Sequence, residues 1–358
     1  MPDRLYLDHA AITPVLPKAR EAIARALERS GNPSSPHADG RQARAALEDA
    51  RRTIADALGW RHDVVFTSGG SEAIHMAASR AKAARRIVGP TEHEAVTAAM
   101  GADANILPIA SDGLIDLAAL ERAVAGAPAL VAIQLVNNET GVIQPIEHIY
   151  EIVRGSGSLL LADCAQAAGK IALPEADFIA ITSQKFGGAP GTGALLARDL
   201  ATLEATGGQE RGYRRGTENL PGIIGMAAAL ECRAFAEAMP RLAKLRVQLE
   251  REIVAAGGLV IAAEAPRIAT IGAYAMAGVA SASQLVQLDL AGISVSAGSA
   301  CSSGSMKPSR VLTAMRVPDE IASTVIRVSF GPSTNESDID RFVREWRKIA
   351  TAAKARAA

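Results

Sequence analysis

Short apolar runs alternate along the chain with longer, alanine-rich segments in which apolar residues recur with helical spacing. The clearest strand candidates are residues 64–67, 130–136, 159–162 and 178–182. The clearest helix candidates are residues 17–29, 40–58, 72–85 and 241–256. Glycine follows several of the helix candidates as a stop signal. Strands that alternate with helices in this way predict an α/β fold with a mainly parallel sheet flanked by helices.

The pattern also indicates two units of unequal size. A long helix candidate follows Pro240, and the segment around Cys301 differs in composition from the rest. We expect a large domain over residues 15–239 and a smaller α+β C-terminal domain over residues 240–358, with residues 1–14 packing against the smaller one. Polar or glycine-rich segments follow the strand candidates directly, and the carboxyl ends of such strands are where chemistry collects.

Composition and charge narrow the classes of function. The 358 residues are 49% hydrophobic, which is enough for a large core. The 38 basic and 38 acidic residues balance, and no block of one sign indicates nucleic acid or a membrane surface as a partner. No apolar run approaches the roughly 18 to 20 residues needed to cross a bilayer. We therefore expect a cytoplasmic protein with a small substrate.

The three cysteines, Cys164, Cys232 and Cys301, form no CxxC pair and are odd in number. We expect a fold without disulfides or a metal site, in a reducing compartment. Cys164 and Cys232 fit the pattern of small buried hydrophobes. Cys301 is flanked only by serine, glycine and alanine, which predicts an exposed loop. An exposed thiol in a reducing compartment indicates reactivity.

Lys185 lies between a strand candidate and a loop with four glycines. A lysine at a strand end in a cleft can lose its proton and form a Schiff base with an aldehyde. A surface or salt-bridged lysine is the alternative interpretation. The glycine-rich stretch alone could also bind a dinucleotide phosphate, but it does not match GxGxxG and follows no βαβ opening.

Three further segments supply what a pyridoxal-phosphate site needs. Gly70, Ser71 and Glu72 open a helix after a strand, where backbone amides can bind phosphate, although Ser71 could simply cap the helix. Asp163 ends an apolar strand and could pair with a pyridine nitrogen or cap a helix. His93, at a helix start, could lie over a planar ring, transfer a proton or act as a cap.

Other polar groups could face the same cleft. Arg327 lies in an apolar strand-like run, where its charge requires an anion, either a structural ion-pair partner or a substrate carboxylate. Residues 137–141 have the composition of a turn with a polar side chain able to reach the cleft. The basic, glycine-bracketed residues 212–219 could reach a phosphate across a dimer interface.

Taken in order along the chain, these segments resemble the NifS-like cysteine desulfurases, within the fold type I (class V aminotransferase) group of pyridoxal-phosphate enzymes. The resemblance covers nearly the whole chain, beginning with residues 5–14 and 31–37. It implies a homodimer that converts L-cysteine to L-alanine and holds the sulfur as a persulfide. A sulfur-acceptor protein, such as an iron–sulfur scaffold, would then collect that sulfur for iron–sulfur cluster or thio-cofactor synthesis.

The resemblance also implies a role for each matching residue. Lys185 would form the Schiff base, His93 would stack on the ring and transfer protons, Asp163 would pair with the ring nitrogen, and Gln166 would contact the ring hydroxyl. The phosphate would be held by Gly70, Ser71, Thr182, Gln184 and the partner subunit's Thr217.

For the substrate, the resemblance implies that Asn138, beside the cofactor, and Arg327 bind the carboxylate, and that Cys301 attacks the sulfur. The sequence departs from the family at residue 184, where histidine is usual and this chain has Gln184. An amide can donate a hydrogen bond to phosphate but adds no positive charge. The stretch 200–207 is also shorter than in the family.

Two other functions compete with sulfur transfer. A related lyase or aminotransferase, for instance one acting on selenocysteine, would have the same cofactor site, and the role of Cys301 separates it from a desulfurase. A non-catalytic scaffold that has lost its cofactor through Gln184 is the second rival, and absence of bound cofactor would identify it.

Overall fold

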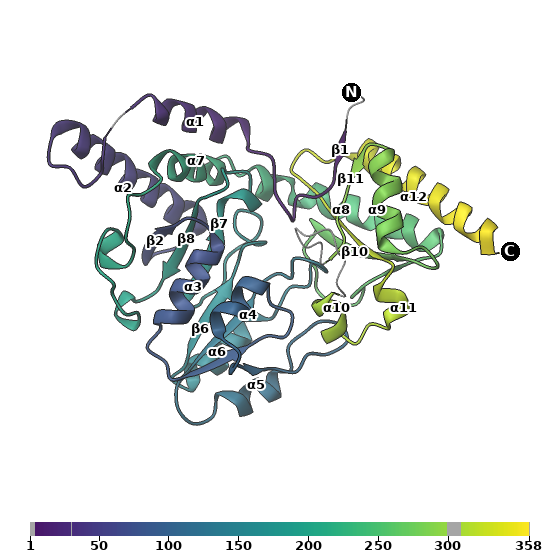
Figure 1. Ribbon diagram of the computed structural model, residues 1–358, viewed down its shortest axis with the longest axis horizontal. Helices are drawn as coiled ribbons and strands as arrows, with labels where there is room; N and C mark the ends of the chain where they lie inside the picture. Colours follow the sequence, from purple (N-terminus) through teal and green to yellow (C-terminus); the bar gives the residue numbers. More distant parts are fainter. Residues whose placement is uncertain (1–3, 30, 299–308, 358) are drawn as a thin grey trace.

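The computed structural model describes residues 4–29, 31–298 and 309–357. Its centre is a seven-stranded sheet (Figure 1). The strands run in the order β2 (Asp63–Thr67), β8 (Gly193–Ala197), β7 (Phe178–Thr182), β6 (Leu159–Asp163), β5 (Ala129–Gln134), β3 (Arg85–Val88) and β4 (Asn105–Ile106). Only β8 runs antiparallel to its neighbours, so the carboxyl ends of the other strands share one edge. The predicted α/β class is confirmed.

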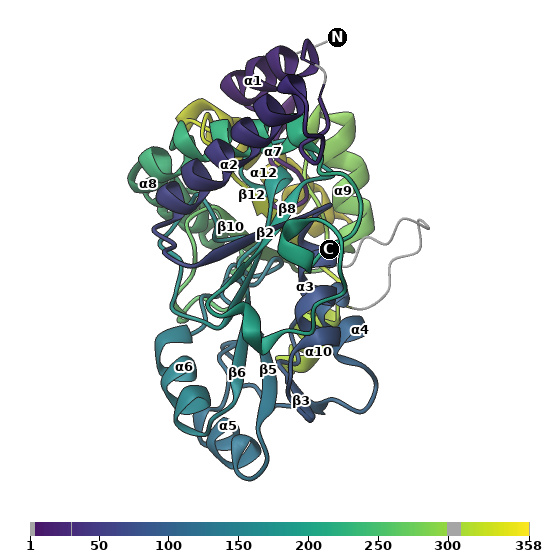
Figure 2. The same ribbon diagram turned by 90° about the vertical axis from the view of Figure 1, so that its left-hand side faces the viewer.

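Helices cover both faces of this sheet, which explains why its strands are apolar on both sides. In β7, Ile179 and Ile181 pack into one core cluster, whereas Phe178 and Ala180 pack into the other. Figure 2 shows α3 and α4 on one side of the strands and α5 and α6 on the other. The first face carries α3 (Gly70–Arg80) and α4 (Glu94–Met100); the second carries α2 (Ala38–Leu58), α5 (Leu117–Val124), α6 (Ile146–Gly155) and α7 (Leu220–Glu231). The N-terminal α1 (Pro17–Leu27) packs on α7.

A smaller antiparallel sheet, in the order β12 (Val325–Ser329), β10 (Ile271–Met276) and β9 (Gly258–Val260), forms the second part of the molecule. Its helices are α8 (Ala234–Ala255), α9 (Ser281–Leu290), α10 (Arg310–Ala314), α11 (Asp319–Ala322) and α12 (Glu336–Ala357). The N-terminal strand β1 (Leu5–Tyr6) pairs in parallel with β11 (Ile293–Ser294), among these C-terminal elements (Figure 1). The domain limits proposed from the sequence stay a prediction, and α8 runs across residue 240.

Two predicted helices differ from the structure. The helix expected over 72–85 ends at Arg80, and Arg85, its expected last residue, begins strand β3. The Arg85 and Arg86 side chains donate to backbone carbonyls around this chain reversal, among them those of Ala78 and Ala127, so distant contacts override the alanine-rich pattern. The helix expected to begin after Pro240 begins at Ala234, and the proline lies within its second turn.

None of the helices in the described ranges is both long and apolar enough to span a bilayer.

Candidate active site

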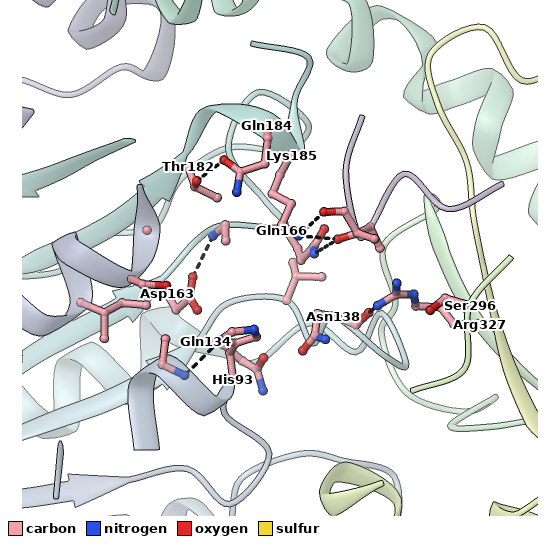
Figure 3. A pocket seen from close by; sticks show the side chains of 18 of the residues that line it. His93, Gln134, Asn138, Asp163, Gln166, Thr182, Gln184, Lys185, Ser296 and Arg327 are labelled. Carbon is pink, nitrogen blue, oxygen red and sulfur yellow. Dashed lines mark hydrogen bonds between the residues drawn. The ribbon is translucent and has the colours of Figure 1, made fainter. Parts of the chain in front are cut away.

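A cavity of about 390 Å³ opens at the carboxyl ends of the parallel strands, beside the N-terminus of α3. Ten residues singled out from the sequence line it: Gly70, Ser71, His93, Asn138, Asp163, Gln166, Thr182, Gln184, Lys185 and Arg327. Figure 3 shows that eight of these side chains, all but Gly70 and Ser71, converge on one space. Cavities of about 300 to 1,000 Å³ are the usual size for small-ligand sites. The large sheet thus supplies most of the wall, and β12 supplies Arg327.

Lys185 extends into this cavity from a short 3-10 helix, Ser183–Lys185, that directly follows β7. Its Nζ donates to the carbonyl oxygens of Ala10 at 2.8 Å and Ala11 at 2.6 Å. Burial, with a smaller effect of the Arg327 charge, lowers the pKa of Lys185 to about 8. It forms no ion pair with the other described residues. A larger fraction of this amine is therefore uncharged near neutral pH, as a nucleophilic lysine requires.

The N-terminus of α3 has amide groups free for an anion. Its N-cap residue is Gly69, which offers no side-chain cap, so Ser71 does not act as the cap that the sequence left open. Nearby, the Thr182 hydroxyl donates to Oε1 of Gln184 at 2.5 Å. That bond fixes the orientation of the amide and leaves the Nε2 donors of Gln184 facing the cavity (Figure 3). This side of the cavity suits a phosphate.

The opposite side presents a carboxyl group and an imidazole. Asp163 is buried at the end of β6, where its Oδ1 accepts the amide N–H of Ala165 at 2.9 Å. Burial raises the pKa of Asp163, while the hydrogen bond from Ala165 and, to a smaller extent, the charge of Lys185 act in the other direction. His93 is the N-cap of α4, because its Nδ1 accepts the amide N–H of Ala95 at 3.1 Å. That bond places the imidazole proton on Nε2.

Gln166 lies between the N-terminal segment and a buried lysine. Its Nε2 donates to the Ala10 carbonyl at 2.8 Å, and its Oε1 accepts from Nζ of Lys170 at 3.3 Å. Lys170 is four residues further along the turn that follows β6, and burial lowers its pKa to about 7. Hydrogen bonds at both the nitrogen and the oxygen of the Gln166 amide therefore hold this group at the cavity.

Arg327 has the structural ion-pair partner that the sequence left open, and its role toward a substrate carboxylate stays a prediction. Its Nη2 pairs with Oδ1 of Asp8 at 2.8 Å, and its Nη1 donates to the Asn138 carbonyl at 3.0 Å. The guanidinium nevertheless lines the cavity together with the Asn138 side chain. Two adjacent donors are thus available for an anionic group of a ligand.

The structure does not bring every candidate together. Thr217 is exposed in the loop before α7 and does not line the cavity. Cys301 lies outside the described residues. Cys164 is fully buried, as expected, and Cys232 is half-buried with its Sγ donating to the Ala229 carbonyl.

Sequence reasoning missed several groups around the cavity: the carbonyls of Ala10 and Ala11, the carboxylate of Asp8, the amide of Gln134 and the amine of Lys170. Alanine carbonyls carry no side-chain signal. Lys170 could have been found from the sequence, because a lysine four residues after Gln166 lies on the same face of a helical turn.

The class-V aminotransferase family model matches residues 5–342. A cysteine desulfurase from Cereibacter sphaeroides is 37% identical over 365 residues, which cover 95% of this chain and 94% of that protein. An IscS-like cysteine desulfurase from Mycobacterium tuberculosis is 37% identical over 94% of this chain and 93% of its own.

Among solved structures, a NifS-like protein from Rickettsia africae superposes with a TM-score of 0.90 at 29% identity, covering 97% of this chain and 99% of that one. The resemblance expected from the order of the motifs is confirmed. The chain belongs to the class-V aminotransferase family and, within it, to the NifS-like cysteine desulfurases.

Proposed function

We propose that the protein is a pyridoxal-phosphate-dependent cysteine desulfurase that converts L-cysteine to L-alanine and transfers the sulfur to Cys301 as a persulfide. The observation that carries this proposal is the meeting, in one cavity, of a lysine with a lowered pKa, a buried carboxyl group and a free helix N-terminus. The relatives named cysteine desulfurase support the same activity.

The residues present fit the cofactor. Asp163 is buried, accepts one backbone N–H and has no hydrogen-bonded cation among the described residues. A protonated ring nitrogen would supply the missing positive partner. The phosphate would lie at the N-terminus of α3, with Ser71, Thr182 and Gln184 as further donors. Lys185 would hold the cofactor covalently, and the cofactor would supply an electron sink for the substrate carbon.

Thr217 would complete the phosphate site from the second subunit of a homodimer. In a single chain it is exposed and outside the cavity, which suits a residue that acts on another copy. Arg214 in the same loop pairs with Glu72 at 2.8 Å and so ties the loop to the first turn of α3.

Lys185 is the proposed base for the α-proton of the substrate. The carbonyls of Ala10 and Ala11 orient its Nζ, and its lowered pKa keeps part of the amine able to accept a proton at neutral pH. His93 would face the ring with an N–H at Nε2, because Nδ1 is engaged by the amide of Ala95. Gln166 would donate to the ring hydroxyl from Nε2.

Arg327 and Asn138 would bind the carboxylate of L-cysteine, with Asp8 holding the guanidinium in place. The thiolate of Cys301 then attacks the substrate sulfur. A sulfur–sulfur bond forms, the carbon–sulfur bond breaks, and its electron pair stays with the three-carbon fragment, which is protonated and leaves as alanine. A sulfur acceptor, such as an iron–sulfur scaffold or another carrier protein, collects the persulfide in the reducing cytoplasm.

The test is incubation of the purified protein with L-cysteine, with alanine and Cys301-bound persulfide measured together. Equal amounts of both in the first turnover are expected, and alanine without persulfide would contradict sulfur transfer. In a Cys301→Ala variant, unchanged sulfide production from cysteine would favour the related lyase. Protein that shows no cofactor absorption band after addition of pyridoxal phosphate would favour a non-catalytic scaffold.

A further inference from the structure

Glu139 is a buried acidic residue next to the cavity that the proposed chemistry does not use. It follows Asn138 in the turn after β5, and its backbone N–H donates to Oδ1 of Asn137 at 2.9 Å. Glu139 is 9% exposed and does not line the cavity. A buried carboxyl group loses its hydration, so it needs hydrogen-bond partners or charges that offset the free-energy cost of desolvation.

The first partner is Ser309, whose hydroxyl donates to Oε2 of Glu139 at 2.6 Å. Ser309 is also the N-cap of α10, because its Oγ accepts the amide N–H of Leu312 at 3.1 Å. Since the lone pairs of Oγ serve the helix, the hydroxyl hydrogen is directed to the carboxyl group. Glu139 is thereby joined to the start of α10.

The second partner is the backbone at Gly298. A Cβ atom added to Gly298 would lie 2.0 Å from Oε2 of Glu139 and 2.8 Å from its Cδ. The carboxyl group therefore occupies the place of a side chain at residue 298, and only glycine leaves room for it. Gly298 and Ser309 flank residues 299–308, the segment that contains Cys301. One carboxyl group contacts both flanks.

The same flanks connect to the proposed substrate-carboxylate groups. Ser296 forms an antiparallel bridge with Arg327, with Arg327 N–H donating to the Ser296 carbonyl at 2.6 Å and Ser296 N–H donating in return at 3.2 Å. Glu139 itself is adjacent in sequence to Asn138. Burial raises the pKa of the Glu139 carboxyl, and the hydrogen bond from Ser309 and the charges of Arg327 and Arg310 offset that rise only in part.

We propose that Glu139 is a positioning residue that holds both flanks of residues 299–308 beside Asn138 and Arg327 and so sets the rate at which Cys301 accepts sulfur. It touches neither the substrate nor the cofactor, and its action is through Ser309 and Gly298. The inference rests on the proposed desulfurase function, and it predicts that cofactor binding and sulfur acceptance can be separated by one substitution.

The experiment compares Glu139→Ala and Glu139→Gln with the unchanged protein in single turnovers. The cofactor spectrum after addition of L-cysteine reports on the first half of the reaction, and alkylation of Cys301 reports on persulfide. We expect Glu139→Ala to slow persulfide formation by about 10- to 100-fold, the scale of a misplaced reacting group, with an unchanged spectral response. Glu139→Gln keeps an acceptor for Ser309 and should recover most of the rate.

Two further variants test the same contacts from the other side. Ser309→Ala removes the hydrogen bond, and adding it to Glu139→Ala should slow persulfide formation little more, because both changes act on one contact. Gly298→Ala places a methyl group where the carboxyl lies and should slow the same step. The matched control is Asp116→Ala, which removes a helix N-cap of similar geometry from α5 and should leave the rate unchanged.

The outcomes separate the inference from the function on which it rests. If Glu139→Ala forms persulfide at the unchanged rate, the inference is wrong while the desulfurase proposal stands. If the variant also loses cofactor or the spectral response to cysteine, Glu139 supports the whole site and the inference is again wrong. If the unchanged protein forms no persulfide, both proposals fail.

Discussion

Gln184 owes its orientation to a neighbour two residues away. The Thr182 hydroxyl occupies Oε1 of the amide, so Nε2 faces the place proposed for the phosphate. The glutamine thus supplies the same kind of donor as the family histidine but without a positive charge. Charge-assisted hydrogen bonds are roughly twice as strong as neutral ones.

We therefore expect Gln184→His to tighten pyridoxal-phosphate binding by about 3- to 10-fold, because a protonated imidazole adds charge beside the phosphate. Titration of cofactor-free protein by absorbance measures the dissociation constants of both forms. Gln184→Leu, which removes the donor and keeps the size, serves as the control and should bind more weakly. Equal affinities of the glutamine and histidine forms would show that the residue does not contact phosphate.

Lys170 and Lys185 make the stability of the cofactor-free protein depend on pH. Burial lowers their pKa values from 10.5 to about 7 and about 8, so between those values and 10.5 the unfolded chain binds more protons than the folded one. Stability from these groups is fully present above the unfolded pKa and is lost as the pH falls toward 7.

Urea unfolding of the cofactor-free protein at several pH values between 7 and 10 measures this slope. We expect stability to rise with pH over that range, and the rise to be smaller in Lys170→Met, which buries no amine. The absolute stability of the variant is not the readout, since the methionine also changes packing around Phe235. An identical slope in both proteins would mean that Lys170 does not contribute to the pH dependence and that its pKa is not lowered in the folded protein.

At the scale of elements, the end of α3 that is proposed to bind phosphate packs closely against β8. A Cβ atom at Gly193 would lie 2.7 Å from Cα of Gly69 and from the Ile181 carbonyl oxygen. The first residue of β8 thus packs against the backbone that begins α3. This contact sets the height of the helix amides above the end of β7, where Thr182 pairs with Gly193.

We expect Gly193→Ala to destabilise the protein by about 1 to 3 kcal/mol, as overpacking of a tight interior does. It should also weaken pyridoxal-phosphate binding, because α3 must move away from Thr182. Urea unfolding and cofactor titration provide the two readouts. Gly155→Ala in α6, where an added Cβ meets nothing within 4 Å, is the control and should alter neither. Unchanged cofactor affinity in Gly193→Ala would show that phosphate binding does not depend on the position of α3.

The elements also show what the sequence could and could not predict. Strands β5, β6 and β7 were recognisable because burial on both faces makes them continuous apolar runs. Strand β3 was hidden in an alanine- and arginine-rich run that has good helix propensity, and its state is set by pairing with β5, over 40 residues away. The local pattern of apolar and polar residues does not indicate such long-range strand pairing.

For the site, the same limit applies to contacts between distant segments. Lysine, aspartate and histidine at strand ends and helix starts indicated the cavity, because those positions converge on one sheet edge. The ion pair between Asp8 and Arg327, and the two alanine carbonyls that hold Lys185, join residues more than 170 positions apart. No spacing rule connects them.

At the scale of the whole molecule, the proposed role of Thr217 requires two copies of the chain. If the partner subunit's Thr217 contacts the phosphate, each site combines residues of two chains. A dimer of one Lys185→Ala chain and one Thr217→Val chain would then contain one site with both substitutions and one site with neither.

We expect such a mixed dimer, isolated with two affinity tags, to bind one equivalent of pyridoxal phosphate covalently and with unchanged affinity. Dimers with Lys185→Ala in both chains should bind none covalently, and dimers with Thr217→Val in both chains should bind it more weakly. Borohydride reduction followed by mass measurement of each chain reports which one carries the cofactor. Weak binding in the mixed dimer would place Thr217 in the site of its own chain.

The pairing of β1 with β11, and of Asp8 with Arg327, has a consequence for the order of events during synthesis. Asp8 leaves the ribosome 319 residues before its partner. At about 5 to 20 residues per second, Arg327 is synthesised on the order of tens of seconds after the segment whose carbonyls orient Lys185. The large sheet can form on the nascent chain, but the proposed cofactor cavity is complete only once Arg327 has been synthesised. We therefore expect ribosome-bound chains stalled before Arg327 has emerged to retain no pyridoxal phosphate, which absorbance of the purified complexes would measure.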